Sequence, residues 1–274
     1  MTRMKYKLIA ADIDGTLLNP EREITPLTKA AVTRCMESGA RFVLSSGRMP
    51  QALAAIGAAL NVNAPAVCFN GGTVVDLASG RTLFSTPLEY GTAMDIARYL
   101  ESAGVYFHAF IHSGYIAPRY DPILTAGYEQ LCGVKARVVN GPVSEFMDEA
   151  PMKLLVVGTP ESAAAILPEL QARFSDRANI MQSQKHLIEC VGKQTSKARA
   201  LEFLREYLSV RPEETCAFGD GMNDLEMLIW AHKPYVMNNA SDRLKNADPR
   251  FTTVPSNAEN GVARTLLKDL EENA

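Results

Sequence analysis

The amino-acid sequence predicts an α/β protein: a Rossmann-like parallel sheet core with helices on both faces, plus an inserted α/β domain. Three observations support this fold class. Short apolar runs alternate with amphipathic segments at both ends of the chain, polar clusters follow several of those runs, and the middle of the chain interrupts the alternation. The 274 residues exceed the usual size of one compact domain, which favours two.

The first part of the chain alternates between predicted strands and predicted helices. Residues 6–11 are an apolar run that ends at Asp12, as expected of a buried strand. Thr25 and Pro26 are typical of a helix start, and Gly39 is typical of its end. The next expected elements are a strand at 41–44, a helix at 50–60 and a strand at 66–69.

The character of the sequence changes between residues 84 and 192, which we interpret as an inserted α/β domain. Helices are expected there near 89–102, 123–131 and 161–174, and strands near 105–110, 115–118, 152–157, 180 and 187–191. The alternation then resumes, with elements expected near 196–208, 215–218, 235–237 and 258–270. Residues 1–83 and 193–274 are therefore predicted to form one core domain.

Composition and charge exclude several functional classes. The formal net charge of -3 gives no field that would attract nucleic acid or an anionic membrane surface. Five scattered cysteines form neither the close pairs of a zinc site nor a disulfide framework, which favours a reducing cytoplasm. No run of about 18 apolar residues appears, so no membrane span is expected. These features predict a cytoplasmic protein without nucleic-acid or membrane partners. A monomer or a homodimer is expected, and the sequence does not decide between them.

Carboxylates follow two of the predicted strands. The segment DIDGT at 12–16 carries Asp12 and Asp14, which in extended geometry would face one pocket at the carboxyl edge of the sheet. An acidic turn without chemistry is the alternative interpretation. The segment GDGMND at 219–224 brings Asp220 and Asp224 to the same edge.

Four converging carboxylates would need a cation, because nearby negative charges cannot all stay ionised. The predicted donor set contains only oxygen atoms, and such a set favours Mg²⁺ over zinc. Calcium storage is the alternative, but the chain lacks the acidic twelve-residue loop of an EF-hand. The sequence therefore predicts a magnesium site.

Two further elements offer what a phosphate group needs. Ser46 and Gly47 provide a hydroxyl and backbone amides, and Lys197 provides a positive charge. Both elements are predicted to open helices, where free amides favour anions. Each also has a plainer interpretation, since Ser46 is a good helix cap and most lysines are solvated.

In order along the chain, these motifs resemble those of the haloacid dehalogenase superfamily, in particular its Cof-type phosphatases. The resemblance spans essentially the whole chain and is weakest in the insertion. It rests on DIDGTLL at 12–18, SSGR at 45–48, Lys197 and GDGMND at 219–224, with further matches at NGG 70–72, NA 239–240 and GVA 261–263. Two positions depart from the family pattern: Ala198 follows the lysine where glycine is usual, leaving Lys193 as a rival, and Asn238 replaces a glycine.

The resemblance implies a role for each motif residue. Asp12 would be the nucleophile and a metal ligand, and Asp14 would be the general acid and base and bind the metal through its backbone carbonyl. Asp220 would complete the protein ligands of Mg²⁺, and Asp224 would act through a metal-bound water. The phosphoryl oxygens would be held by Ile13, Ser46, Gly47, Lys197 and Asn223, with Asn70 in support.

The implied activity is the magnesium-dependent hydrolysis of small phosphorylated metabolites, such as sugar phosphates or phosphorylated cofactors, through an aspartyl-phosphate. The inserted domain, residues 84–192, would act as a cap that selects the leaving group. A phosphomutase and a non-catalytic metabolite-sensing protein are the alternatives. Candidate cap residues for substrate contact are His112, Tyr115, Arg119, Tyr120 and His186.

Overall fold

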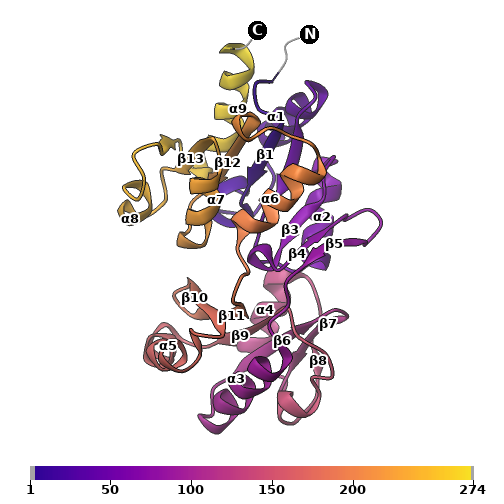
Figure 1. The fold of residues 1–274 in the computed structure, drawn as a ribbon, viewed down its shortest axis with the longest axis vertical. Helices are drawn as coiled ribbons and strands as arrows, with labels where there is room; N and C mark the ends of the chain where they lie inside the picture. Colours follow the sequence, from indigo (N-terminus) through magenta and orange to yellow (C-terminus); the bar gives the residue numbers. More distant parts are fainter. Residues whose placement is uncertain (1–3, 273–274) are drawn as a thin grey trace. The chain divides into compact units, whose positions relative to one another are not determined.

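The structure, a computed structural model, describes residues 4–272. These residues form two compact units (Figure 1). Unit 1 contains the chain up to residue 84 and from residue 196 onward, and unit 2 is Ser85–Thr195. Unit 2 is therefore an insertion in sequence, because the chain leaves unit 1 once and later returns to it. Catalysis by unit 1 and substrate selection by unit 2 stay predictions.

Unit 1 is built on a five-stranded sheet in the order β14-β13-β12-β1-β2. All neighbouring strands run parallel. The strands are β1 (Leu8–Ala11), β2 (Arg41–Leu44), β12 (Thr215–Gly219), β13 (Lys233–Met237) and β14 (Thr252–Val254). Because β1 lies between β2 and β12, the segments that follow these three strands lie next to one another at the carboxyl edge.

Helices cover both faces of this sheet. Successive side chains of a strand point to opposite faces, and the strands are buried, so both faces need to be covered. Leu8 and Ala217 pack in one apolar cluster with Leu201 of α6 and Leu228 of α7. The helices of unit 1 are α1 (Pro26–Glu37), α2 (Pro50–Leu60), α6 (Lys197–Tyr207), α7 (Leu225–Trp230), α8 (Asp242–Lys245) and α9 (Gly261–Glu272). The predicted α/β class is confirmed.

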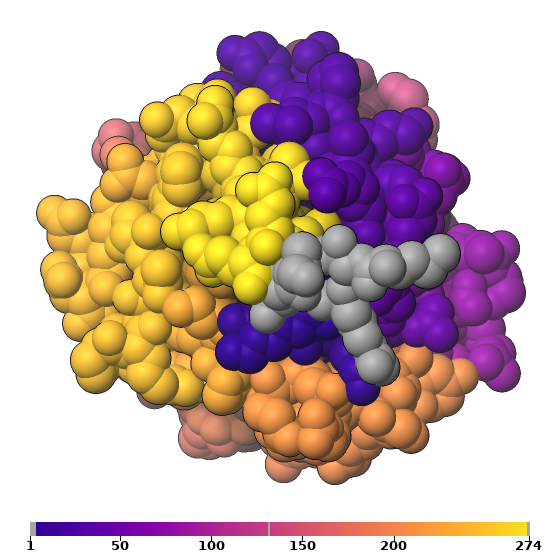
Figure 2. Space-filling model, turned by 90° about the horizontal axis from the view of Figure 1, so that it is seen from above, coloured from indigo at the N-terminus to yellow at the C-terminus, as the bar shows by residue number. Residues whose placement is uncertain are grey.

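The opposite face of the sheet is covered by α1 and α9, which contact each other. Tyr235 stacks on Phe218 with ring centroids 4.7 Å apart. Its hydroxyl donates to Asp269 Oδ2 of α9 at 2.7 Å. Seen from above, the yellow C-terminal residues lie beside indigo residues of the first part of the chain (Figure 2).

The strand expected at 66–69 belongs to a different sheet from the one predicted. β3 (Ala66–Cys68) pairs antiparallel with β4 (Thr73–Val75), and β5 (Thr82–Ser85) completes this three-stranded sheet. A single parallel bridge between Ser45 and Val67 links it to the end of β2. The alternation of strands and helices suggested another parallel strand, but the Asn-Gly pair after β3 reverses the chain into a hairpin.

Unit 2 contains a six-stranded sheet in the order β10-β11-β9-β6-β7-β8. Its strands pair antiparallel except β7 and β8. Leu100 of α3 and Leu170 of α5 pack with Ile188 of β11 in one apolar cluster. The elements are α3 (Tyr90–Ser102), β6 (Phe107–Ile111), β7 (Gly114–Ala117), α4 (Leu124–Cys132), β8 (Arg137–Val138), β9 (Lys153–Val157), α5 (Pro160–Phe174), β10 (Ala178–Gln184) and β11 (Leu187–Gly192).

The five cysteines are free and buried. Burial raises the pKa of the Cys35 and Cys190 thiols to about 12, so neither is a reactive thiolate near neutral pH. In the part of the chain that the structure describes, no helix is long and apolar enough to cross a membrane.

Candidate active site

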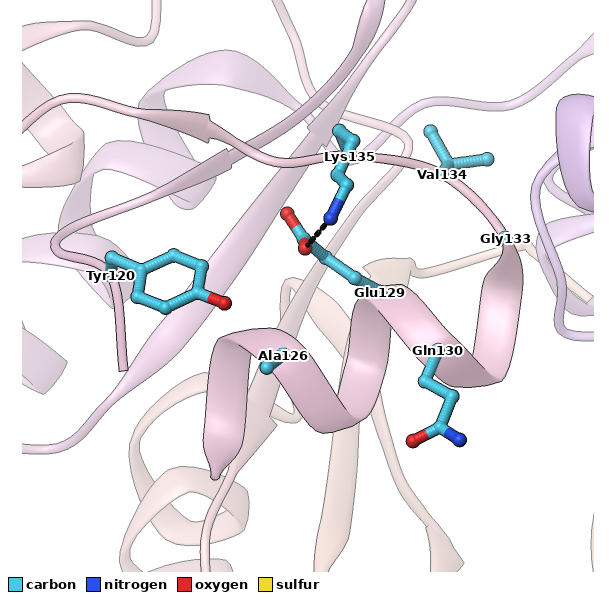
Figure 3. A pocket seen from close by; sticks show the side chains of 7 residues that line it. All are labelled: Tyr120, Ala126, Glu129, Gln130, Gly133, Val134 and Lys135. Atoms are coloured by element: carbon cyan, nitrogen blue, oxygen red, sulfur yellow. Dashed lines mark hydrogen bonds and ion pairs between the residues drawn. The ribbon is translucent and has the colours of Figure 1, made fainter. Parts of the chain in front are cut away.

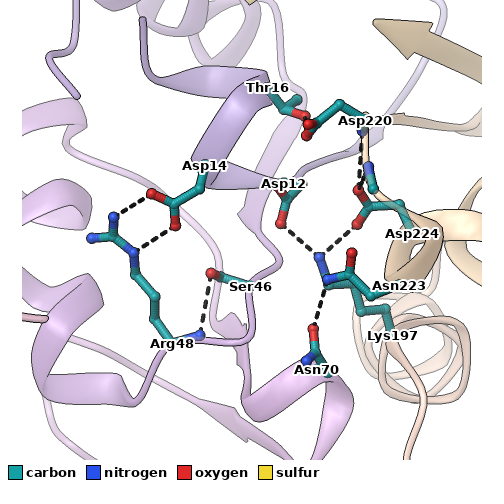
Figure 4. A network of polar contacts seen from close by, with 11 residues as sticks. Asp12, Asp14, Thr16, Ser46, Arg48, Asn70, Lys197, Asp220, Asn223 and Asp224 are labelled. Carbon is teal, nitrogen blue, oxygen red and sulfur yellow. Dashed lines mark hydrogen bonds and ion pairs between the residues drawn. The ribbon is translucent and has the colours of Figure 1, made fainter. Parts of the chain in front are cut away.

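A buried lysine joins two carboxylates at the carboxyl edge of the core sheet. Asp12 directly follows β1, and its Oδ1 accepts a hydrogen bond from Lys197 Nζ at 2.6 Å. The same ammonium donates to Asp224 Oδ1, also at 2.6 Å. Lys197 is 1% exposed although it is the first residue of α6, because its side chain points inward to this pair (Figure 4).

A third carboxylate, that of Asp220, completes an acidic cluster. One oxygen of each of Asp12, Asp220 and Asp224 lies within 4.8 Å of the others. Asp224 Oδ2 accepts from the backbone amides of Asp220 at 3.0 Å and Gly221 at 2.9 Å, which fixes the loop after β12. Two segments about 200 residues apart in the chain are thus brought together by the neighbouring parallel strands β1 and β12.

Two residues of the DIDGT segment hold Asp220 in place. Thr16 Oγ1 donates to Asp220 Oδ1 at 2.7 Å. Gly15 has a φ of +84°, and a Cβ at this position would lie 2.3 Å from Asp220 Oδ2. Only glycine therefore allows the turn and the carboxylate to approach so closely. The contact of Thr16 was not predicted, although Thr16 belongs to the DIDGT motif and follows Asp14 by two residues.

The charges of this cluster do not balance. Burial, followed by the charge of Asp224, raises the pKa of Asp12 well above its ordinary value, and Lys197 opposes that shift. Burial and Asp224 likewise raise the pKa of Asp220 to about 6. Burial would lower the pKa of Lys197, but the charges of Asp12 and Asp224 outweigh it and raise that pKa. One ammonium is too little positive charge for three carboxylates.

This donor set fits a divalent cation. The three carboxylates offer oxygen ligands from a confined, partly buried space, and the raised pKa values show that additional positive charge would be favourable there. Among the described residues, this is the one group of three or more acidic, histidine or cysteine side chains close enough to share an ion.

Asp14 does not point toward this cluster. Arg48 binds its carboxylate with a two-pronged ion pair, Nε to Oδ2 at 2.8 Å and Nη2 to Oδ1 at 2.5 Å (Figure 4). The extended geometry expected for residues 12–16 is therefore wrong, and so is the convergence of four carboxylate side chains. Asp14 itself keeps extended backbone angles (φ -81°, ψ 117°), but Gly15 after it is left-handed (φ 84°), so residues 12–16 do not continue as a strand.

Ser46 and Gly47 lie in a loop rather than at the start of a helix. α2 begins at Pro50 and its N-cap is Met49, so the expected helix opening at Ser46 is not found. Ser46 is buried, and its Oγ accepts from the Arg48 backbone amide at 3.3 Å. The contact of Arg48 with Asp14 was not predicted. Its only indication in the sequence is the SSGR motif, which places an arginine at this edge of the sheet.

The remaining predicted phosphate ligands lie around the same edge. Ile13 is buried directly after Asp12. Asn223 Nδ2 donates to Asn70 Oδ1 at 3.1 Å (Figure 4). Lys193, the rival to Lys197, belongs to unit 2, where its Nζ donates to the Ser175 carbonyl. Lys197 is thus the lysine that reaches Asp12.

The candidate cap residues differ in their surroundings within unit 2. Tyr115 is buried and stacked on Phe110, as expected of a core aromatic. Tyr120 lines a pocket of about 290 Å³ beside α4, where Lys135 Nζ contacts Glu129 Oε2 at 2.7 Å (Figure 3). None of the predicted catalytic, phosphate or metal residues lines this pocket.

Comparison with known proteins identifies the family. Residues 9–266 match the sequence pattern of the haloacid dehalogenase-like hydrolases. A Haemophilus influenzae protein named provisionally as a phosphatase is 30% identical over 269 residues, covering 96% of each chain. A haloacid dehalogenase-like hydrolase from Bacteroides thetaiotaomicron superimposes with a TM-score of 0.85 at 26% identity, covering 96% of this chain and 99% of that one.

A haloacid dehalogenase-like hydrolase from B. subtilis gives a TM-score of 0.82 at 26% identity, with 95% and 99% of the two chains covered. The match thus includes both the core strands and the insertion. The resemblance seen in the sequence motifs is confirmed, and the chain belongs to the haloacid dehalogenase-like hydrolase family.

Proposed function

We propose that this hydrolase is a magnesium-dependent phosphatase of small phosphate monoesters, with Asp12 as its nucleophile. One observation carries the proposal: a buried lysine and an acidic cluster with surplus negative charge surround Asp12 at the carboxyl edge of the sheet. Phosphoryl transfer needs positioning and charge neutralisation more than it needs elaborate covalent chemistry. This site offers both.

Asp12 attacks phosphorus in the first step. A bond forms between its carboxylate oxygen and phosphorus as the bond from phosphorus to the leaving oxygen breaks, which gives an aspartyl-phosphate and a free alcohol. Lys197 holds Asp12 Oδ1 and so orients the carboxylate. The backbone of Ile13, the Ser46–Gly47 loop, Lys197 and Asn223 would hold the phosphoryl oxygens.

Asp14 moves the protons in both steps. It gives a proton to the leaving alkoxide, then takes one from the water that attacks the aspartyl-phosphate and releases inorganic phosphate. In the present conformation, Arg48 engages both oxygens of the Asp14 carboxylate. At least one oxygen must therefore leave Arg48 before Asp14 serves the leaving group.

The acidic cluster would hold Mg²⁺ through Asp12, Asp220 and the backbone carbonyl of Asp14, with Asp224 acting through a bound water. Bound Mg²⁺ would neutralise the carboxylates and the arriving phosphate dianion. Thr16 keeps Asp220 aimed at this cluster. Lys197 and the backbone amides that bind Asp224 limit how far the carboxylates can move.

Unit 2 would act as a cap that selects the leaving group, since the core residues recognise only the phosphate. The substrates we propose are phosphorylated metabolites such as sugar phosphates and phosphorylated cofactors. Unit 2 has its own sheet and apolar core, which suits an element that varies while the chemistry of unit 1 stays fixed.

A phosphate-release screen over a broad panel of phosphorylated metabolites tests this proposal. We expect release of inorganic phosphate with Mg²⁺ present, and loss of that release when the cation is chelated. Asp12→Asn serves as the inactive control and Asp248→Asn as the matched active one, because Asp248 pairs with Arg250 instead. An isomerised product without free phosphate would identify a mutase, and no turnover of any compound would contradict an enzymatic role.

A further inference from the structure

The turn after β3 has an unusual backbone. Phe69, Asn70 and Gly71 are successive residues with φ values of +52°, +54° and +97°. Left-handed backbone is uncommon for residues with a side chain, and it is a clear outlier for a bulky aromatic residue. Such strain persists where the surroundings hold the chain, and it concentrates at functional positions. The contacts that hold this turn are therefore candidates for a functional role.

One side of the turn holds the loop that carries Ser46. The Phe69 backbone amide donates to the Arg48 carbonyl at 3.0 Å, and the Asn70 amide donates to the Ser46 carbonyl at 3.0 Å. Gly47 lies directly against the Asn70 side chain, because a Cβ on Gly47 would be 2.9 Å from Asn70 Nδ2. The turn thus engages two backbone carbonyls of the loop that carries Ser46 and Gly47.

The other side of the turn meets the start of α6. A Cβ on Gly71 would lie 2.0 Å from the Ser196 carbonyl oxygen and 2.8 Å from the Lys197 backbone nitrogen. The two backbones are therefore in direct contact at the peptide bond between Ser196 and Lys197, next to the Cα that carries the Lys197 side chain. Asn70 Oδ1 also accepts from Asn223 Nδ2, which connects the turn to the loop after β12.

We infer that the turn Phe69–Gly71 is the positioning element of the phosphate site, with Asn70 and Gly71 as its positioning residues. It sets the spacing between the Ser46 loop, the start of α6 at Lys197 and the Asn223 side chain, which come from three separate parts of the chain. The identity of the ligand as a phosphoryl group rests on the proposed function. Neither Asn70 nor Gly71 needs to touch that group.

Two glycine variants test the role of the backbone contact. Gly71→Ala adds a methyl group that must push Ser196 and Lys197 away, whereas Gly39→Ala adds one at a nearly equal φ of +95° with nothing within 4 Å. Both place alanine at nearly the same left-handed φ, so the difference between the two variants reports the clash of the turn with the start of α6. With Mg²⁺ present, we expect Gly71→Ala to raise the Kd of inorganic phosphate by about tenfold or more, and Gly39→Ala to leave it unchanged.

A second pair keeps the test decisive if Gly71→Ala does not fold. Asn70→Ala removes the acceptor of Asn223, and Asn61→Ala changes an exposed asparagine with a similar φ of +50°. We expect Asn70→Ala to raise the Kd of phosphate by roughly three- to tenfold, and Asn61→Ala to lower only the melting temperature. The Kd is measured by titration calorimetry well below the melting temperature of each variant, where nearly all of the protein is folded, so that simple destabilisation does not move it.

An unchanged Kd of phosphate in Asn70→Ala and in any folded Gly71→Ala would overturn the inference. So would an equal rise of the Kd in the control variants Asn61→Ala and Gly39→Ala. The absence of phosphate binding by the wild-type protein would overturn it as well. A wild-type protein that binds phosphate but hydrolyses no ester would refute the proposed function alone. In that case the Kd values would still decide the role of the turn.

Discussion

Each of the two units buries a lysine, and the two lysines differ in the charge around them. In unit 2, Lys153 Nζ contacts Glu189 Oε2 at 3.1 Å and lies 4.8 Å from the centre of the Phe110 ring. In unit 1, Lys197 contacts Asp12 and Asp224 at 2.6 Å, with Asp220 nearby. Both lysines are almost completely buried. The first contact joins one cation to one anion, whereas the second cluster has three carboxylates around one ammonium.

This difference separates a structural ion pair from a site that can bind a ligand. A matched pair in a protein interior needs no further charge, and its role is to keep two polar groups satisfied. A cluster with surplus negative charge is costly until a cation joins it, as the raised pKa values of Asp12 and Asp220 indicate. Burial of a charge alone would not have distinguished the two lysines.

The largest expected effect comes from the nucleophile in the surplus-charge cluster. Asp12→Asn keeps the size of the side chain but removes the attacking carboxylate, so we expect kcat/KM to fall by at least about 10⁴-fold with any substrate. Phosphate-release kinetics measure this loss, and circular dichroism should show an unchanged fold. Turnover near the wild-type level would remove Asp12 from the mechanism.

The two lysines can be compared directly by the same substitution. With Mg²⁺ present, Lys197→Met should lower kcat/KM by about 10²- to 10³-fold, because a charge aimed at the phosphoryl group is lost. Lys153→Met should instead destabilise unit 2 by about 3–5 kcal/mol, since Glu189 stays buried without its lysine, while kcat/KM of the folded protein stays within about threefold. Steady-state kinetics and urea unfolding measure the two effects.

A double substitution sharpens this contrast. Lys153→Met combined with Glu189→Leu replaces the ion pair with apolar side chains, and much of the lost stability should return. No second substitution should restore turnover to Lys197→Met. If Lys153→Met reduced turnover as strongly as Lys197→Met, the distinction between the two lysines would fail.

A smaller effect is expected at Arg48, and it should depend on the leaving group. Arg48→Gln removes the guanidinium that would hold one Asp14 oxygen while the other serves the leaving group, so kcat/KM for an alkyl phosphate should fall by about 10- to 100-fold. With p-nitrophenyl phosphate, whose leaving group needs no proton, it should change by less than about threefold. The parameter kcat/KM reports only steps up to leaving-group departure, so the later hydrolysis step does not confuse the comparison.

Arg205 provides a matched control for Arg48. It forms the same two-pronged pair with Glu202, at 2.8 and 2.6 Å, and its side chain is 16% exposed, as is that of Arg48. Arg205→Gln should affect neither substrate. Equal losses for both substrates in Arg48→Gln would indicate phosphate binding by Arg48 instead of orientation of Asp14.

The smallest expected effect is on stability and depends on pH. Asp220 has a folded-state pKa of about 6, above its ordinary value of 3.8, so the folded protein binds more protons between those pH values. Without cation, the free energy of unfolding should therefore fall as pH rises from about 4 to about 6, by at most about 3 kcal/mol from this group. The loss should persist at higher pH.

Mg²⁺ should reverse this loss, because cation binding favours the ionised carboxylates. The rise in melting temperature caused by Mg²⁺ should thus be larger at pH 8 than at pH 5. Asp220→Asn should be more stable than wild type without cation at pH 8, and Mg²⁺ should hardly stabilise it. An equal rise at both pH values would show that the surplus charge does not belong to the cation site.

Much of the fold was predictable from local patterns. α2 and β2 have the predicted bounds, because proline at a helix start and short apolar runs are strong local signals. The hairpin of β3 with β4 was not predicted, since its Asn-Gly turn competes with the alternation of strands and helices. When two local patterns apply to the same segment, the sequence alone does not show which of them determines the structure.

The site could be predicted as a set of residues but not as a set of contacts. Strand order brings the segments after β1 and β12 together, which the motifs already implied. The direction of the Asp14 side chain depends on the left-handed Gly15, and its contact with Arg48 depends on the loop before α2. Such features follow from backbone angles over three or four residues, which spacing alone does not determine.

The most direct test of the central claim is a crystal structure of the protein with Mg²⁺ and orthovanadate. The account predicts vanadium within bonding distance of an Asp12 carboxylate oxygen, Lys197 Nζ on an equatorial oxygen, and the cation between Asp12 and Asp220. Vanadate bound away from Asp12, or a cation held by other residues, would contradict it.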